Sequence, residues 1–178
     1  MSQVVTILGI DPGYGRMGWC VGQVGSENAV GKTSSGANDL KFLGYDCIET
    51  AASLSIMERY QQIQLTLQEI IQKYHPQEAA LESLFFHSNQ KTVMRVSEAR
   101  GLIIGALLNH HIACFEYTPL QIKQAVTGFG QAEKSAVERM LRLQFNFGHD
   151  KILDDTMDAI GVTMTHATSR KLSQLTKL

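Results

Sequence analysis

The chain has 178 residues, of which 44% are hydrophobic and 19% are charged. This length suits one domain with a sizeable core, and the composition is typical of a soluble globular protein. A net charge of −1 argues against a chain that is basic overall, and no apolar run reaches the roughly 18–20 residues of a membrane-spanning helix.

The N-terminus and the cysteines indicate in which compartment the protein works. The N-terminus lacks the basic start and apolar stretch of a secretory signal, and three widely spaced cysteines predict neither a disulfide framework nor a zinc site. We therefore expect a cytoplasmic protein.

The charges are unevenly distributed along the chain. Residues 1–90 contain 5 Lys and Arg against 9 Asp and Glu, whereas residues 91–178 contain 11 against 8. A surface for nucleic acid is thus expected in the second half of the chain.

The first part of the chain predicts strands. Residues 4–11 read as a buried strand, and residues 17–24 read as a second strand after a glycine-rich turn. Residues 25–38 are rich in Gly, Ser and Asn, which predicts a loop, and residues 41–49 read as a third strand. Three consecutive strands joined by turns favour an antiparallel meander.

The pattern then changes to helices and strands in alternation. Apolar residues between Ile56 and Tyr74 recur every three or four positions, which predicts an amphipathic helix that Pro76 ends. Residues 78–86 read as a fourth strand. Residues 92–109 predict a helix that is apolar nearly all round in its second half, so it needs covering on more than one side, either centrally or at a subunit interface.

The last part predicts one short strand and three helices. The strand covers residues 112–117, and the helices cover about 119–126, 134–145 and 155–168. The order βββαβαβααα predicts an α/β fold with one mixed sheet flanked by helices, in a single domain of residues 1–178 without repeats.

Several carboxylates stand in unusual places. Asp11 ends an apolar strand, Glu82 lies within another, and Asp155 and Asp158 share a helix face at i and i+3. Singly, each has a structural explanation as a turn cap, a strand-end residue or a helix-dipole partner, and Asp154 is a candidate N-cap. Together they favour a site for a hard divalent cation such as Mg²⁺, because buried carboxylates are costly unless paired or metal-bound. A pair of such ions can hydrolyse a phosphodiester.

Five segments carry a resemblance to a known family. ILGIDPGYGRMGW, ALESLFFHSNQKT, VSEARGLIIGALL, QIKQAVTGFGQAEKSAV and DDTMDAIGVTMTHA occur in this order, from about residue 5 to residue 168. The chain resembles the RuvC family of bacterial Holliday-junction resolvases. One such motif is weak, but five in order at fitting distances are highly specific.

The resemblance implies a ribonuclease-H-like fold, with a five-stranded mixed sheet whose first three strands are antiparallel. It implies a homodimeric crossover junction endodeoxyribonuclease with two Mg²⁺ ions per active site, for which Mn²⁺ can substitute. Such enzymes bind four-way junction DNA and make symmetric paired nicks in homologous recombination and DNA repair. They work with the branch-migration motor RuvAB. The loop 25–38 looks longer than in the family, and its role is open, as is the preferred cleavage sequence.

The resemblance also assigns roles to residues of this chain. The catalytic, metal-binding tetrad is Asp11, Glu82, Asp155 and Asp158; Asp154 is the rival for the third place, but it lies one residue too far from Asp158. The candidate DNA contacts are Lys123, Lys134, Phe85, Phe86, Lys91 and Arg95, and Arg16 is a further candidate for a phosphate. The candidate dimer interface is Arg100, Ile103, Ile104 and Leu107, in the helix after the fourth strand, and Arg100 could instead touch DNA.

Three other functions compete with the resolvase. Another nuclease of the same fold could cut RNA–DNA hybrids or flaps, although the interface helix and the spacing of Lys123 and Lys134 favour the resolvase. A nucleotide-binding protein of the actin and sugar-kinase fold shares a D-x-G strand turn but needs two such domains. A DNA-binding module without activity would lack at least one of the four acids, and all four are present.

Overall fold

The computed structural model describes residues 4–25, 40–83, 90–147 and 151–175, without the side chains of residues 90, 91 and 171–175. Phe85, Phe86, the side chain of Lys91 and nearly all of the loop 25–38 lie outside the described residues. In chain order the elements are β1 (Val5–Asp11), β2 (Arg16–Val24), β3 (Lys41–Glu49), α1 (Ile56–Tyr74), β4 (Glu78–Glu82), α2 (Gln90–Asn109), β5 (Ala113–Tyr117), α3 (Pro119–Thr127), α4 (Lys134–Gln144) and α5 (Asp154–Leu175).

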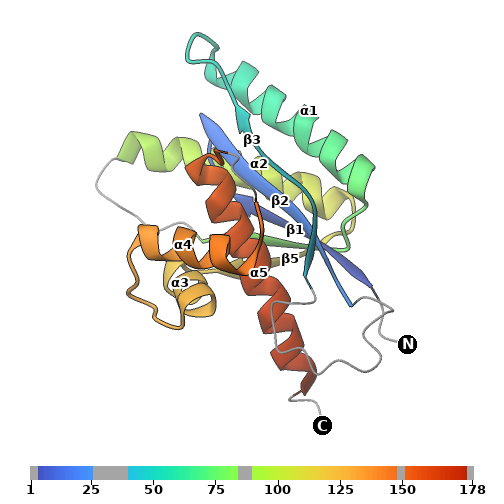
Figure 1. Cartoon of the computed structure of the whole chain (residues 1–178). Coiled ribbons are helices and arrows are strands. Elements are labelled where there is room, and N and C mark those ends of the chain that lie inside the picture. Colours follow the sequence, from blue (N-terminus) through green and yellow to red (C-terminus); the bar gives the residue numbers. More distant parts are fainter. Residues whose placement is uncertain (1–3, 26–39, 84–89, 148–150, 176–178) are drawn as a thin grey trace.

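The five strands form one mixed sheet in the order β3-β2-β1-β4-β5 (Figure 1). β1 pairs with β2 and β2 with β3 in antiparallel fashion, while β1 pairs with β4 and β4 with β5 in parallel. The predicted α/β fold, with an initial antiparallel meander, is therefore confirmed. The parallel pairs need crossover connections, which α1 and α2 provide.

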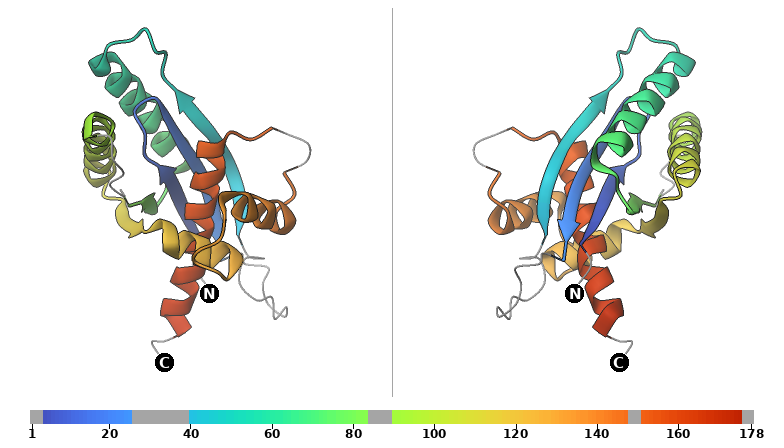
Figure 2. Two further views of the ribbon diagram at one scale, coloured as in Figure 1. Left: turned by 90° about the vertical axis from the view of Figure 1, so that its left-hand side faces the viewer. Right: turned by 90° about the vertical axis from the view of Figure 1, so that its right-hand side faces the viewer.

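Helices cover both faces of the sheet, so the chain has three layers (Figure 2). α1 and α2 pack on one face, in a core that includes Leu8, Ile10, Ile63 and Leu107. α3, α4 and α5 pack on the other face, in a second core that includes Ile160. β1 lies in the middle of the sheet and is buried on both sides, which explains its unbroken apolar sequence.

Alternation along the strands puts two of the unusual carboxylates on the same face. Leu8 and Ile10 of β1 belong to the core beneath α1 and α2, so Asp11 faces the α5 side. Leu81 of β4 likewise faces α1 and α2, so Glu82 faces the α5 side as well. The two carboxylates come from adjacent parallel strands, at the ends where both strands stop.

α5 lies unusually close to the sheet because glycines face it. A methyl group at Gly18 would collide with the backbone carbonyl of Asp155, and one at Gly9 would collide with the side chain of Thr163. The Thr163 hydroxyl also donates a hydrogen bond to the carbonyl of Cys20, at 3.2 Å. The contact at Gly18 places the first turn of α5 directly against β2, and the contacts of Thr163 hold the helix against β1 and β2 further along.

Local signals explain where the flanking helices begin and end. α1 starts at a capping box, in which Ser55 and Glu58 bind each other's backbone N–H groups, and it ends at His75 in the left-handed conformation. α3 has the same arrangement from Thr118 and Gln121, and it ends at Gly128.

Two predicted boundaries differ from the structure by more than two residues. The fourth strand was predicted over 78–86, but β4 ends at Glu82, because its partner β5 ends at Tyr117 and the next residue caps α3. The last helix was predicted over 155–168, but α5 runs from Asp154 to Leu175. Asp154 thus belongs to the first helical turn and does not precede it as an N-cap. None of the helices in the described part of the chain could cross a membrane.

Candidate active site

The fold brings the predicted tetrad to one place. Asp11 and Glu82 stand at the ends of β1 and β4, and α5 begins above them with Asp155 and Asp158 on its first turns. Burial, together with the charges of the other three acids, raises the pKa of Asp11 from its ordinary value of 3.8 to about 8. Each of the three therefore lies within electrostatic reach of Asp11, although 71 or more residues separate them from it in sequence.

Glu82 and Asp158 show the same two effects. Burial and, after it, the charge of Asp158 raise the pKa of Glu82 to about 7. Burial also raises the pKa of Asp158, although Lys134 acts in the opposite direction. Within the described residues, the carboxylates of Asp11 and Glu82 make no hydrogen bond or ion pair. These two carboxylates are thus gathered with other acids but have no ion-pair partner among the described residues.

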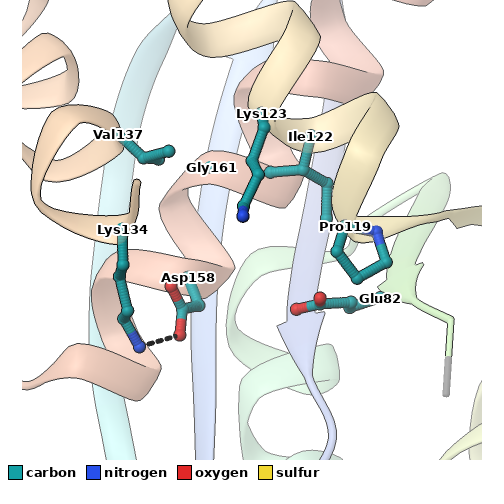
Figure 3. Close-up of a pocket in the computed structure, with 8 residues that line it drawn as sticks. All are labelled: Glu82, Pro119, Ile122, Lys123, Lys134, Val137, Asp158 and Gly161. Carbon is teal, nitrogen blue, oxygen red and sulfur yellow. Dashed lines mark hydrogen bonds and ion pairs between the residues drawn. The ribbon is translucent and has the colours of Figure 1, made fainter. Parts of the chain in front are cut away.

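Two basic side chains pair with the acids on α5. The ammonium of Lys134, at the start of α4, lies 2.7 Å from Oδ2 of Asp158 (Figure 3). It also lies 3.8 Å from Oδ2 of Asp154. On the other side, Nε of Arg16 lies 3.1 Å from Oδ2 of Asp155.

A cavity of about 280 Å³ opens beside the acids. Glu82, Asp158, Lys123 and Lys134 point into it from four different elements, as Figure 3 shows. Its remaining wall is formed by Pro119, Ile122, Val137 and Gly161. Two carboxylates and two ammonium groups in one open cavity can hold a cation and an anionic phosphate side by side.

The residues present fit a hard divalent metal ion. The donors are carboxylate oxygens on rigid elements, which is the ligand type that Mg²⁺ and Mn²⁺ take. Oδ2 of Asp155 is buried, and its contact with Nε of Arg16 is an ion pair without hydrogen-bond geometry. Among the residues that the structure describes, no three acidic, histidine or cysteine side chains are arranged to hold a metal ion. Metal binding would therefore draw the carboxylates together.

The other predicted site residues divide into three groups. Lys123 and Lys134 line the cavity. Arg95 instead pairs with Glu98 on the same helix, at 2.9 Å, and does not line the cavity. Phe85, Phe86 and the side chain of Lys91 lie outside the described residues, so the structure does not place them.

The predicted interface requires a correction. Ile103 and Leu107 have no exposed surface, because they pack into the chain's own core against α1 and the sheet. They are not free to contact a second chain. Arg100 is paired with Glu116 of β5 and is largely covered. Ile104 is only partly buried and keeps some surface for a partner.

Two further residues have roles that the sequence did not reveal. The pairing of Arg16 with Asp155 joins residues 139 positions apart, and no local pattern indicates it. His166 is buried between Tyr117 and Glu78, with its ring nitrogens 2.7 and 2.8 Å from their oxygens. Burial lowers the pKa of His166, while Glu78 acts in the opposite direction.

The fold and the site together define a class. Carboxylates at the ends of two adjacent parallel strands and on a helix packed across them, over a mixed five-stranded sheet, are typical of the ribonuclease-H-like nucleases. Figure 3 shows the part of this site that opens into the cavity.

Comparison with known proteins identifies the family. The model of the family described as crossover junction endodeoxyribonuclease RuvC matches residues 7–166. A relative from Alkaliphilus metalliredigens, the crossover junction endodeoxyribonuclease RuvC, is 38% identical over 172 residues, which are 97% of this chain and 98% of the relative. The chain therefore belongs to the RuvC family.

Solved structures agree on the fold. Thermus thermophilus RuvC is 26% identical and superimposes with a TM-score of 0.79, covering 94% of this chain and 96% of that one. T. thermophilus RuvC in complex with a Holliday junction substrate superimposes with a TM-score of 0.81 at 24% identity, covering 95% and 96% of the two chains.

Proposed function

We propose that this chain is a crossover junction endodeoxyribonuclease, a metal-dependent enzyme that resolves four-way DNA junctions by symmetric paired nicks. The observation that carries the proposal is the convergence of Asp11, Glu82, Asp155 and Asp158 at one end of the sheet, beside a cavity with two lysines. Membership of the RuvC family, across nearly the whole chain, supports the choice of substrate.

The four carboxylates would hold the metal ions, and we propose two Mg²⁺ per active site, with Mn²⁺ as a substitute. When bound, the ions supply an activated water and stabilise the leaving oxygen of the phosphodiester. The chain's own contribution is to fix the donor oxygens on β1, β4 and α5. The glycines of β1 and β2 under α5 let the helix, with its acids, pack closely against those strands.

The lysines of the cavity would bind the DNA backbone. Lys123 and Lys134 approach the acids from α3 and α4, so a phosphate between them would lie next to the carboxylates. By resemblance we retain Phe85 and Phe86 as residues that stack on bases at the junction centre, and Lys91 and Arg95 as backbone contacts.

A four-way junction has two strands to cut, so two active sites are needed, and we propose a homodimer formed through α2. The outer face of α2 exposes apolar residues, among them Leu108 with 57% of its surface accessible. A methyl group at Gly101 or Gly105 would meet no atom within 4 Å, so that side of the helix is open to a close neighbour. A cytoplasmic location and the motor RuvAB as a partner are proposed by resemblance alone.

The test of the function is a cleavage assay with labelled synthetic DNA. A four-way junction, a linear duplex of the same sequence and an RNA–DNA hybrid are incubated with the protein, with and without Mg²⁺. We expect paired, ligatable nicks in the junction only, and only with metal. Cleavage of the hybrid or of a flap would move the substrate to another nuclease class, and tight junction binding without cleavage would indicate a binding module.

The dimer is tested separately. Replacement of Ile104 by Glu puts a charge on the outer side of α2 and is expected to weaken the dimer at least about tenfold, as sedimentation velocity would measure. Leu65→Glu on α1 is the matched control, because Leu65 is 54% exposed on another helix. An intact dimer in the Ile104 variant would move the interface elsewhere.

A further inference from the structure

We infer that Arg16 is a resident counter-cation of the acidic site, which a divalent metal ion must displace from Asp155 before the site is assembled. The inference rests on the proposed function and adds a regulating residue to it. It explains why the carboxylates are gathered but not arranged as a metal site: one of them is held by a cation that belongs to the protein itself.

In the ion pair of Arg16 with Asp155, the backbone of both residues is fixed, but the side chain of Arg16 is not. The turn before Arg16 is fixed by Thr50, whose hydroxyl and backbone N–H donate hydrogen bonds to the carbonyls of Tyr14 (2.8 Å) and Gly15 (2.9 Å). Asp155 is fixed by the close packing of α5 on Gly18. The Arg16 side chain, in contrast, is 51% exposed, so its guanidinium can leave Asp155 without any change in the backbone.

A second carboxylate is available to the displaced guanidinium. Arg16 and Glu49 are directly paired across β2 and β3, so their side chains share a face of the sheet. All three charges act on the thiol of Cys47: its pKa is raised mostly by burial, then by the charges of Asp155 and Glu49, and it is lowered by that of Arg16. Displacement therefore moves Arg16 from a carboxylate of the tetrad to one outside it.

The opposite side of the site repeats this pattern. Lys134 binds Asp158 of the tetrad at 2.7 Å and has Asp154, outside the tetrad, at 3.8 Å. Each side of the site thus has one internal cation, one carboxylate that a metal needs and one carboxylate that it does not need. In the absence of metal the two cations offset part of the repulsion among the acids, and they compete with a metal ion for the same carboxylates.

The direction of the effect on metal affinity separates this inference from its main rival. If Arg16 merely orients Asp155 as a ligand, then Arg16→Gln weakens metal binding. If Arg16 competes with the metal, the same substitution strengthens it. We expect Mn²⁺ to bind Arg16→Gln about threefold to fivefold more tightly than wild type, the range set by a partly exposed ion pair.

The measurement is a titration of free Mn²⁺ by electron paramagnetic resonance, without DNA, on the full chain. Lys41→Gln is the matched control, because it removes one positive charge at the other end of β3 and should leave the affinity unchanged. Unchanged or weaker binding by Arg16→Gln would overturn the inference. If wild type showed no saturable Mn²⁺ binding, or if Asp11→Asn left that binding intact, the proposed metal site would fail, and this inference would fail with it.

A second measurement needs no substitution. The Nε–H signal of Arg16 in a protein with ¹⁵N-labelled arginine should shift as Mg²⁺ saturates the site, because its partner changes. The Nε–H signal of Arg142, which is paired with Glu138 at 2.9 Å, is the internal control and should stay in place. An Arg16 signal that does not move through saturation would overturn the inference.

Discussion

β4 places two glutamates under α5, and they have opposite surroundings. Glu78, at the start of the strand, is bound by His166 at 2.8 Å and by Arg170 at 2.7 Å. Glu82, four residues later on the same face, makes no ion pair within the described residues and lies near Asp11 and Asp158. The same residue type in the same strand is thus neutralised at one end of α5 and left without a partner at the other.

The difference separates a carboxylate with a structural role from one that we propose as a metal ligand. Glu78 joins β4 to the C-terminal half of α5, and its charge is satisfied by the protein. Glu82 is held where its charge is unfavourable, which costs stability unless a cation binds. A carboxylate of the second kind implies a ligand from outside the chain, and the following four predictions test that distinction.

The largest effect is expected for Asp11→Asn. Removal of a direct metal donor should lower metal-dependent junction cleavage more than about 100-fold, whereas junction binding in the absence of metal should remain, because the carboxylate serves the metal. A cleavage assay measures the first effect, and a gel-shift titration measures junction binding. Asp154→Asn is the control and should retain most activity, since Asp154 is exposed outside the tetrad. Loss of fold or of junction binding in Asp11→Asn would contradict the assignment.

Glu78→Gln should lower the stability of the protein and should not act on the cleavage reaction. It leaves His166 and Arg170 without a carboxylate in a half-buried site, so we expect a loss of about 2 kcal/mol in the free energy of unfolding, measured with urea. Glu138→Gln breaks an exposed pair on α4 and should cost less than about 0.5 kcal/mol. Equal effects of the two substitutions would show that Glu78 is not a structural anchor.

Asp11, under the start of α5, and His166, in the C-terminal half of that helix, should make the stability of the protein depend on pH with opposite signs. Asp11 has its pKa raised to about 8, so the folded, metal-free protein keeps a proton that the unfolded chain releases near pH 4. The stabilisation that Asp11 contributes to the folded state is therefore fully present below about pH 4, and it is lost as the pH rises through about 8. The pKa of His166 is lowered, so its contribution is present above about 6.5 and is lost as the pH falls.

The test compares wild type with Asp11→Asn in urea and a metal chelator. The substitution should stabilise the protein more at pH 8 than at pH 5, with a difference of at least about 1 kcal/mol. Because both proteins contain His166, its titration cancels in the comparison. A difference of the opposite sign would mean that Asp11 is ionised and stabilised by the protein itself.

The smallest effect is expected for Tyr117→Phe. The hydroxyl of Tyr117 lies 2.7 Å from Nδ1 of His166, and its loss should cost about 1 kcal/mol in unfolding free energy without a change in cleavage rate. Tyr45→Phe is the control, because its hydroxyl makes no hydrogen bond to the described residues. A change in cleavage rate would instead link the His166 end of α5 to the active site.

The sequence by itself determined the fold class, the order of the elements and the four acids. Period-two and period-3.6 patterns come from burial on one or two faces, and burial is a property that each segment shows locally. Asp11 and Glu82 stood out because a carboxylate at the end of an apolar strand contradicts that pattern. The ends of β4 and α5 were less predictable, because β4 ends where its neighbour β5 does.

Only the tertiary structure decided which charges meet. Nothing near Arg16 or Lys134 in sequence indicates that they pair with Asp155 and Asp158, since those contacts arise when α4 and β2 are brought beside α5. For the same reason, the periodicity of α2 could not show that Ile103 and Leu107 face the chain's own core. A pattern shows that a side chain must be covered, but only packing determines what covers it.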